Sequence, residues 1–209
     1  QRITIYGEQN VPESIRAEAK EKGAILHVLG EDFDFQREAQ SWQWRSKNGT
    51  AIDSLPQPAL IGECQFTNAA VAIAVSQQLI DFPVDGFDII EGLEIVRCRG
   101  RYEISEDEPQ CIFDVAHNPA SIAALSETLM AYSIKGKTRI VFGVMADKDI
   151  AAMVAGLIDV IDQWYLAAAK IPRAAEPDVI EAVCLNNGVA ANRLRQFASV
   201  SEATVQALR

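Results

Sequence analysis

Beyond about residue 100 the sequence repeats one rhythm three times: an apolar strand, a polar loop and an amphipathic helix. The expected strand and helix pairs cover residues 111–115 and 118–132, 139–144 and 148–161, and 163–168 and 177–187. Near-continuous apolar strands that alternate with helices are typical of a parallel sheet covered on both faces. The rhythm therefore predicts an α/β fold. Right-handed crossovers would bring the three polar loops to one edge of the sheet, where α/β proteins bind ligands.

The residues before this rhythm follow a mixed pattern. It predicts a strand that ends near Tyr6, a surface helix, a second strand, a buried helix and a last helix, the latter four over residues 12–22, 24–28, 67–79 and 87–95. Asn48-Gly49 follows the alternating Trp42–Arg45 segment and indicates a hairpin in which Trp42 and Trp44 pack. Because the pattern changes near Arg97–Arg101, we place a domain boundary there, with domains at 1–97 and 98–209.

Composition excludes several classes of protein. The net charge of −10 argues against nucleic-acid binding, which depends on Lys and Arg neutralising phosphates. No apolar run is long enough to cross a membrane and no signal-peptide pattern opens the chain, so we expect a cytoplasmic protein. Two histidines are too few for a multi-histidine metal centre. The scattered cysteines are expected to be buried thiols, with neither disulfides nor zinc, and they are Cys64, Cys98, Cys111 and Cys184.

The segment with the most chemical content runs from Phe113 to Pro119. Asn118 is suited to cap the following helix and Pro119 to open it. Asp114 would then lie at the end of a strand, where a carboxylate can accept a ribose hydroxyl, and His117 can donate to an anion. The alternative, that Asp114 and His117 only satisfy backbone groups of the loop, is compatible with the same residues.

Three other positions are suited to polar ligands. Lys148 lies in a loop after a strand and can face a phosphate, although a turn capped by neighbouring aspartates is the simpler reading. Arg173 follows the next strand and can grip a carboxylate with two parallel hydrogen bonds, with an ordinary surface arginine as the alternative. In the first domain, Asn68 offers an amide suited to an adenine edge, with a helix-capping amide as the alternative.

These segments resemble signatures of the folylpolyglutamate synthases and bifunctional dihydrofolate synthases, within the Mur ligase superfamily. Residues 113–119 match the family's Phe-Asp-Val-Ala-His-Asn-Pro, and residues 143–149 match its Gly-Met-x-x-Asp-Lys-Asp, with Val144 in place of Met. Asn68-Ala69-Ala70 and Gly100-Arg101 match two further segments. The resemblance implies a Rossmann-like C-terminal Mur ligase domain with a mostly parallel sheet, truncated before its last strand. The end of the central P-loop ATPase domain would precede it.

By this resemblance the chain belongs to an ATP-dependent ligase. ATP and Mg²⁺ would activate a carboxylate of dihydropteroate or folate as an acyl phosphate, which the amino group of L-glutamate would attack. The residues that match the nucleotide site are Asn68 for adenine, Asp114 for the ribose, Arg101 for the phosphates and, as a further phosphate contact, Lys148. Near the reaction centre the matches are His117 and, for the incoming amino acid, Arg173.

The chain also departs from the family. It has no Gly-x-x-x-x-Gly-Lys-[Ser/Thr] phosphate cradle, and it opens on Gln1 without an initiator methionine. We therefore expect a piece of a longer protein, inactive alone, whose P-loop and Mg²⁺ ligands lie in a missing N-terminal half. Alternatives are another Mur-type amide ligase and a non-catalytic nucleotide- or protein-binding module. An upstream P-loop would favour a ligase, and an upstream folate-binding loop would favour this family.

Overall fold

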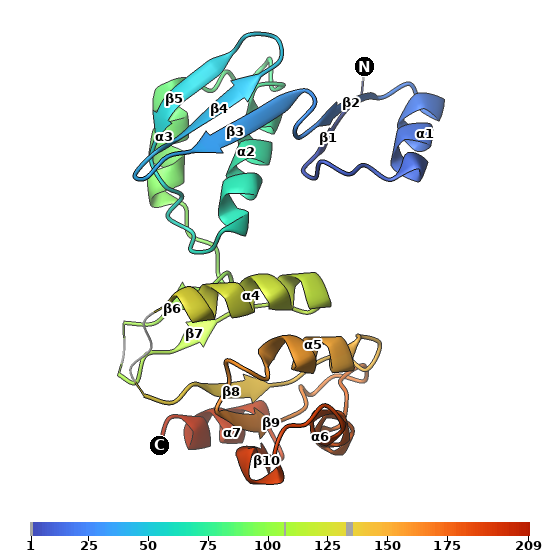
Figure 1. The fold of residues 1–209 in the computed structure, drawn as a ribbon, viewed down its shortest axis with the longest axis vertical. Helices are drawn as coiled ribbons and strands as arrows, with labels where there is room; N and C mark the ends of the chain where they lie inside the picture. The colour runs from blue at the N-terminus through green and yellow to red at the C-terminus, as the bar shows by residue number, and fades with distance from the viewer. Residues whose placement is uncertain (1, 107, 133–135) are drawn as a thin grey trace. The chain divides into compact units, whose positions relative to one another are not determined.

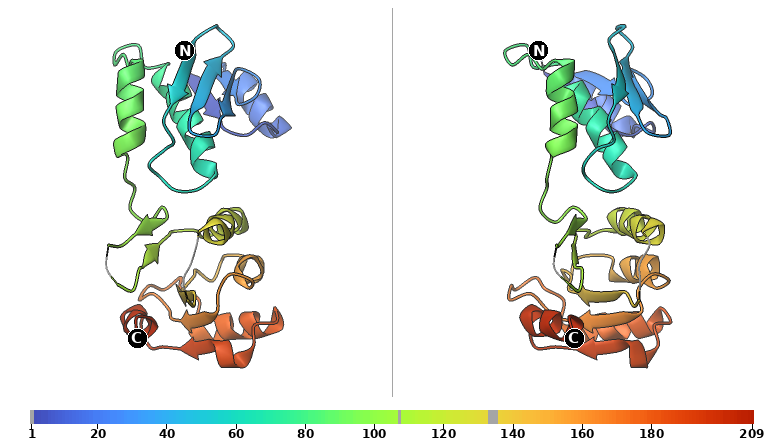
Figure 2. Two further views of the ribbon diagram at one scale, coloured as in Figure 1. Left: turned by 60° about the vertical axis from the view of Figure 1, so that its left-hand side comes forward. Right: turned by 90° about the vertical axis from the view of Figure 1, so that its left-hand side faces the viewer.

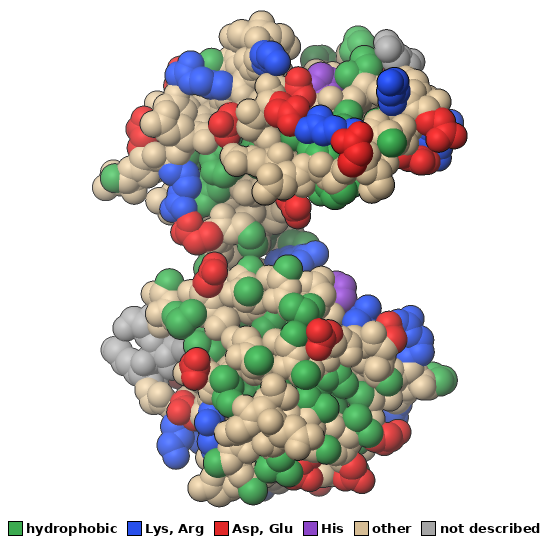
Figure 3. Space-filling view, turned by 45° about the vertical axis from the view of Figure 1, so that its right-hand side comes forward, with side chains coloured by type: hydrophobic (Ala, Val, Ile, Leu, Met, Phe, Trp, Pro, Cys, Tyr) green, Lys and Arg blue, Asp and Glu red, His purple; other side chains and the backbone are tan. Residues whose placement is uncertain are grey.

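The computed structural model describes residues 2–106, 108–132 and 136–209. The chain divides into two compact units, residues 1–98 and residues 99–209 (Figure 1). The assignment of these units to domains of a larger ligase stays a prediction. Acidic and basic side chains are interspersed over the face of each unit drawn in Figure 3. Among the described residues, no helix combines the length and the apolar character needed to cross a membrane.

The first unit combines a parallel pair of strands with an antiparallel sheet of three. Its elements are β1 (Ile3–Tyr6), α1 (Glu13–Glu21), β2 (Ile25–Val28), β3 (Phe33–Arg37), β4 (Trp42–Ser46), β5 (Ala51–Leu55), α2 (Cys64–Ser76) and α3 (Gly86–Ile95). β1 and β2 pair in parallel, and β4 lies between β3 and β5. The predicted helices and hairpin are confirmed. β3 is absent from the prediction, which began the hairpin at Trp42.

One face of the β3–β5 sheet forms the core of this unit. Trp42 and Trp44 lie two residues apart on β4, so both side chains point to the same side. Both are fully buried, and the Trp44 indole nitrogen donates to the carbonyl oxygen of Ala70 in α2 at 3.1 Å. Their predicted role in hairpin packing is confirmed. The turn into β5 contains Gly49 with a φ of 96°, a value that favours glycine.

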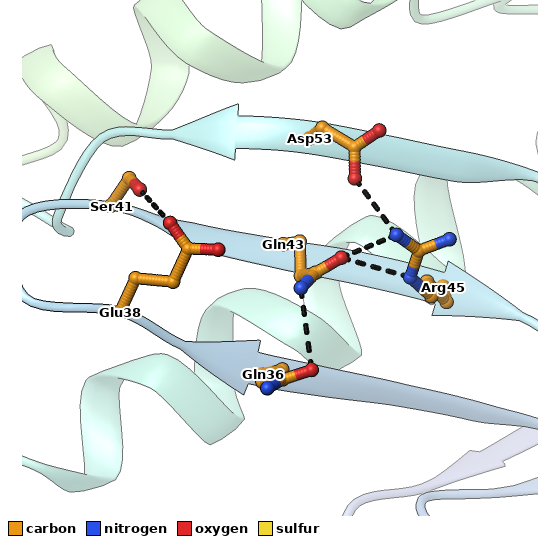
Figure 4. Close-up of polar contacts among 6 residues, drawn as sticks. All are labelled: Gln36, Glu38, Ser41, Gln43, Arg45 and Asp53. Carbon is orange, nitrogen blue, oxygen red and sulfur yellow. Dashed lines mark hydrogen bonds and ion pairs between the residues drawn. The ribbon is translucent and has the colours of Figure 1, made fainter.

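The other face of the same sheet is polar (Figure 4). The side-chain amide of Gln43 on β4 donates to Gln36 Oε1 on β3 at 3.3 Å. Arg45, also on β4, donates to Asp53 on β5 at 3.2 Å. The β3–β5 sheet therefore has one apolar face and one solvated face that carries these cross-strand contacts, as is common in antiparallel sheets.

The second unit is built around a parallel sheet. Its elements are β6 (Glu103–Ile104), β7 (Ile112–Phe113), α4 (Pro119–Ala131), β8 (Arg139–Phe142), α5 (Ile150–Leu157), β9 (Gln163–Leu166), α6 (Pro177–Asn186), a 3-10 turn (Ala191–Arg193), β10 (Leu194–Gln196) and α7 (Val200–Ala207). The sheet has the order β10-β9-β8, and both pairings are parallel. The predicted α/β class with a mostly parallel sheet is confirmed.

Helices cover both faces of this sheet: α5 and α6 lie on one side and α7 on the other (Figure 2). Trp164 and Leu166 of β9 are fully buried in a core that includes Met153 of α5. Tyr165 points to the opposite side and packs in a cluster with Ala203 of α7. Because side chains alternate along a strand and both sides are covered, β9 is apolar at nearly every position.

The strand before α4 does not belong to this sheet, so its predicted placement is wrong. β7 pairs antiparallel with β6, and the third parallel strand is β10. The chain turns back ahead of β6 through Gly100 and Tyr102, whose φ angles are 70° and 48°. A short apolar run does not specify its hydrogen-bonded neighbour, and the local pattern of residues 111–115 fits either pairing.

The cysteines differ in burial. Cys184 of α6 is fully buried, and its burial raises the pKa of the thiol to about 11. Cys111 is half-buried, whereas Cys64 and Cys98 are exposed, so the expectation of buried thiols is wrong for these two. None of the four forms a disulfide.

Candidate functional site

The entry into α4 is a hydrogen-bonded cap. Asn118 is the N-cap, and its side chain accepts from the Ser121 amide at 2.8 Å. The Ser121 hydroxyl oxygen in turn lies 3.2 Å from the amide of Asn118 and 3.1 Å from that of His117, and accepts from both. Pro119 occupies the first turn. The predicted cap is confirmed, and it fixes the loop between β7 and α4.

The Asp114 carboxylate ties this loop to the turn before β6. Its Oδ2 accepts from the Tyr102 amide at 2.9 Å and its Oδ1 from the Ala116 amide at 2.7 Å. The Val115 amide adds a hydrogen bond to the Gly100 carbonyl at 2.9 Å. These contacts agree with the alternative in which Asp114 satisfies backbone groups of its loop. These hydrogen bonds do not use the full acceptor capacity of the carboxylate. An ionised carboxylate has about four acceptor positions, and Asp114 is exposed to solvent.

The same turn places Arg101 beside the Asp114 loop. A Cβ at Gly100 would lie 2.7 Å from Val115 Cγ1, so only glycine permits this close approach and the positive φ together. Arg101 is exposed and makes no hydrogen bond or ion pair with another described residue. Its guanidinium is therefore available to an anion at the loop that holds Asp114.

His117 presents one ring nitrogen to solvent. Its Nδ1 lies 3.0 Å from the carbonyl oxygen of Val115. A carbonyl oxygen only accepts, so Nδ1 carries the proton in this contact. In the neutral ring Nε2 is then an acceptor, and in the charged ring it becomes a donor.

The loops after β8 and β9 meet. The Ala146 amide donates to the Arg173 carbonyl at 2.9 Å, and the Arg173 guanidinium donates to the two Asp147 carboxylate oxygens at 3.2 and 3.4 Å. Lys148 Nζ lies 3.5 Å from the same carboxylate. The predicted convergence at the carboxyl edge of one sheet is confirmed for Lys148 and Arg173. It is wrong for Asp114 and His117, because β7, the strand before their loop, is outside that sheet.

The sequence predicts the aspartates beside Lys148 only as helix caps, which is confirmed for Asp149 and wrong for Asp147. It is Asp149 that caps α5, through a hydrogen bond from the Ala152 amide at 3.0 Å, whereas Asp147 pairs with Arg173 across 26 positions of sequence. No local sequence pattern predicts an ion pair between residues so far apart in the chain. The hydrogen bond from Arg173 is the main cause that holds the pKa of the Asp147 carboxyl below its usual range, and a backbone hydrogen bond and the nearby charge of Lys148 add to it.

Replacing Arg173 by Ala is expected to raise the pKa of Asp147 toward its ordinary value, because the strongest interaction with the ionised carboxylate is lost. In the native chain the carboxylate consequently stays ionised to lower pH than in the variant. Carboxyl-carbon NMR titration of the 209-residue chain measures the shift. Lys170→Ala removes an exposed cation that makes no contact with Asp147 and serves as the control. Equal Asp147 titrations in the two variants would contradict this assignment.

Asn68 lies in the first unit, whereas the other five candidate residues lie in the second. α2 begins at Cys64, so Asn68 is in the second turn of the helix and is not its cap; the N-cap is Glu63. The Asn68 amide nitrogen donates to Gln65 Oε1 at 3.0 Å. The capping alternative is therefore wrong, and the side-chain carbonyl of Asn68 keeps its capacity to accept.

The described residues offer few ligands to a divalent metal ion. Within residues 2–106, 108–132 and 136–209, no three His, Cys, Asp or Glu side chains gather closely enough to hold a metal ion. The donors present at the candidate site are cations, one imidazole and single carboxylates, a set that fits an anionic ligand better than a metal.

The second unit is thus an α/β domain whose strand-to-helix loops present cationic, carboxylate and imidazole groups. Residues 100–209 match the family model described as Mur ligase, glutamate ligase domain. The chain belongs to this Mur ligase family. The resemblance to folylpolyglutamate and dihydrofolate synthases is confirmed by its relatives.

The dihydrofolate synthase/folylpolyglutamate synthase of Escherichia coli is 34% identical over 171 residues, which are 82% of this chain and 39% of that protein. A structure of E. coli FolC in complex with DHPP and ADP is 30% identical over the whole chain, with a TM-score of 0.84. A bifunctional folylpolyglutamate synthase/dihydrofolate synthase with Mn, AMPPNP and L-glutamate bound is 32% identical over 99% of it, with a TM-score of 0.83. This chain spans 47% of each of those two structures.

Proposed function

We propose that this chain is the C-terminal part of an ATP-dependent ligase that joins L-glutamate to dihydropteroate or to a folate. ATP would phosphorylate a carboxylate of the folate or its precursor. The amino group of glutamate would then attack the acyl phosphate, which gives an amide, ADP and phosphate. The observation that carries the proposal is the similarity over the entire chain to FolC in complex with DHPP and ADP. The related structure with AMPPNP and L-glutamate supports the same substrates.

We assign nucleotide-binding roles residue by residue, as the family segments that these residues match imply. Asp114 accepts from the ribose hydroxyls with the lone pairs that its backbone contacts leave open. Arg101 and Lys148 supply positive charge to the phosphates. Asn68 donates its amide to Gln65, and its carbonyl oxygen is left to accept from the amino group of adenine.

The amino-acid end of the reaction is assigned to His117 and Arg173. The neutral His117 ring offers Nε2 as an acceptor near the attacking amine. Arg173 engages Asp147 through one terminal nitrogen, so its other donors remain for a carboxylate of glutamate.

The rest of the site would lie in an N-terminal half. The chain's Gly136-Lys137-Thr138 run precedes β8, whereas a P-loop follows a strand and opens a helix. We therefore place the cradle for the β- and γ-phosphates and the Mg²⁺ ligands outside this chain. We also place the reaction in the cytoplasm, with no nucleic-acid or membrane partner.

Replacing Arg173 by Ala in the whole enzyme is expected to raise the KM for glutamate while the KM for ATP stays unchanged. Losing a hydrogen bond between charged groups corresponds to about ten- to a hundredfold in affinity, and the exposure of Arg173 places the effect near the lower end. Steady-state kinetics with each substrate varied in turn separates the two constants. Lys170→Ala is the control. An increase in the KM for ATP alone would contradict the role given to Arg173.

A further inference from the structure

The α7 side of the β8–β10 sheet changes character along the strands. At the carboxyl half, Tyr165 and Ala167 pack under α7 in an apolar cluster. At the amino end, Arg139 lies opposite Gln163, and Arg195 lies opposite Tyr165, between that end and the apolar cluster. By the alternation of side chains along β-strands, all of these residues share one face of the sheet. This face is therefore apolar at one end and cationic at the other.

An open cavity of about 260 Å³ lies at the cationic end. Its lining residues are Lys137, Arg139, Gln163, Tyr165, Arg195, Gln206 and Arg209. Four of these seven residues are Lys or Arg, and no side chain among the seven is acidic. We call these four, Lys137, Arg139, Arg195 and Arg209, the amino-edge cluster.

No acidic side chain among the described residues lies within ion-pair distance of the amino-edge cluster. None of the four takes part in an ion pair, although the whole chain carries a net charge of −10. Arg139 donates to the Ala207 carbonyl at the end of α7 at 2.7 Å, and the Arg195 guanidinium lies 5.9 Å from the Tyr165 ring centroid. These contacts orient the guanidinium groups but supply no negative charge.

Tyr165, one of the lining residues, is closely packed. Tyr165 is 4% exposed and stacks on Phe197, with ring centroids 5.7 Å apart and an angle of 12° between the planes. The side-chain amides of Gln163 and Gln206 add neutral donors to the rim. A concave, well-packed site with several cations and amide donors favours oxyanions, because planar guanidinium groups match phosphate and carboxylate geometry.

We propose that the amino-edge cluster binds a small multivalent anion that carries at least two closely spaced phosphate or carboxylate groups. One oxyanion would leave most of the four charges unpaired, whereas a multivalent anion engages them together. The cavity lies at the amino ends of β8 and β9. Lys148 and Arg173 lie in the loops that follow the carboxyl ends of the same strands, so the two sites are separate.

The test is calorimetric titration of the 209-residue chain with pyrophosphate, tripolyphosphate and citrate. Arg139→Gln combined with Arg195→Gln is expected to weaken binding of the preferred anion at least tenfold. Lys20→Gln combined with Lys170→Gln changes the net charge equally, at exposed lysines outside the cavity, and is expected to change affinity less than twofold. Because Arg139 also holds the end of α7, a second pair, Lys137→Gln with Arg195→Gln, tests the cluster if the first pair does not fold.

The three probes distinguish the chemical class of the anion. Preference for the polyphosphates indicates a phosphorylated ligand, and preference for citrate indicates a polycarboxylate; both support the proposal. Equal affinities in the cluster variants and the lysine control would overturn it, because binding would then reflect net charge alone. Loss of the tight binding in Arg173→Ala would also overturn it, by moving the anion to the other edge. Tighter binding of a short single-stranded DNA than of tripolyphosphate would replace it with a nucleic-acid surface.

Discussion

Replacing Asp114 by Ala in the whole enzyme is expected to lower kcat/KM for ATP about ten- to a hundredfold, because a hydrogen bond to a charged group contributes about 1.5–3 kcal/mol. The carboxylate serves twice. In the proposed site it offers acceptors to the ribose, and in the structure it holds the turn that carries Arg101 through its bond to the Tyr102 amide. Under the proposed assignment, the variant loses the contact to the ribose and loosens the phosphate contact of Arg101.

Kinetics with ATP and glutamate varied separately measures this effect. Asp159→Ala removes an exposed carboxylate of the same unit that makes no hydrogen bond or ion pair with a described residue, so it controls for net charge. The KM for glutamate is expected to change little in the Asp114 variant. If only that KM rose and kcat/KM for ATP stayed at its original value, the nucleotide role of Asp114 would be wrong.

Replacing Trp164 by Ala is expected to lower the free energy of unfolding of the second unit by about 3–5 kcal/mol, the usual cost of deleting a buried aromatic side chain. Trp164 is fully buried in the middle of β9, and its ring meets the Phe142 ring edge-on at a centroid distance of 5.6 Å. A loss of this size is a large part of the 5–15 kcal/mol that typically stabilises a domain.

Trp164→Phe separates packing from polarity. The Trp164 indole nitrogen is buried and finds no hydrogen-bond partner among the described residues, so phenylalanine keeps an aromatic ring and removes an unpaired donor. We expect Trp164→Phe to cost much less than Trp164→Ala in urea unfolding followed by circular dichroism. Equal losses in the two variants would show that the ring does not support the core in this way.

Much of the fold can be predicted from the sequence, because the local residue pattern and the tertiary packing favour the same helices and strands. β9 is apolar on both sides, and Asn118-Pro119 starts α4 with a cap that needs only neighbouring residues. The sequence does not predict β10, because this strand has only three residues, Leu194–Gln196, of which only Leu194 is buried. β6 was missed for a related reason, since a two-residue strand has no periodicity to detect.

The candidate site can be predicted from the sequence only in part. The sequence singled out Asp114, His117 and Arg173 from their positions next to helix starts. It does not predict that Asp114 accepts from the Tyr102 amide or that Asp147 accepts from one terminal nitrogen of Arg173. Both contacts join residues at least twelve positions apart, and tertiary packing alone decides them.

Glutamate-dependent ADP release tests the central claim most directly. The whole protein that contains this chain is expected to release ADP only when ATP, L-glutamate and dihydropteroate or a folate are all present, with product mass increased by one glutamate residue. The 209-residue chain alone is expected to release none, because it has no P-loop. ADP release by the purified chain, or release by the whole protein that does not depend on glutamate, would contradict the proposed ligase.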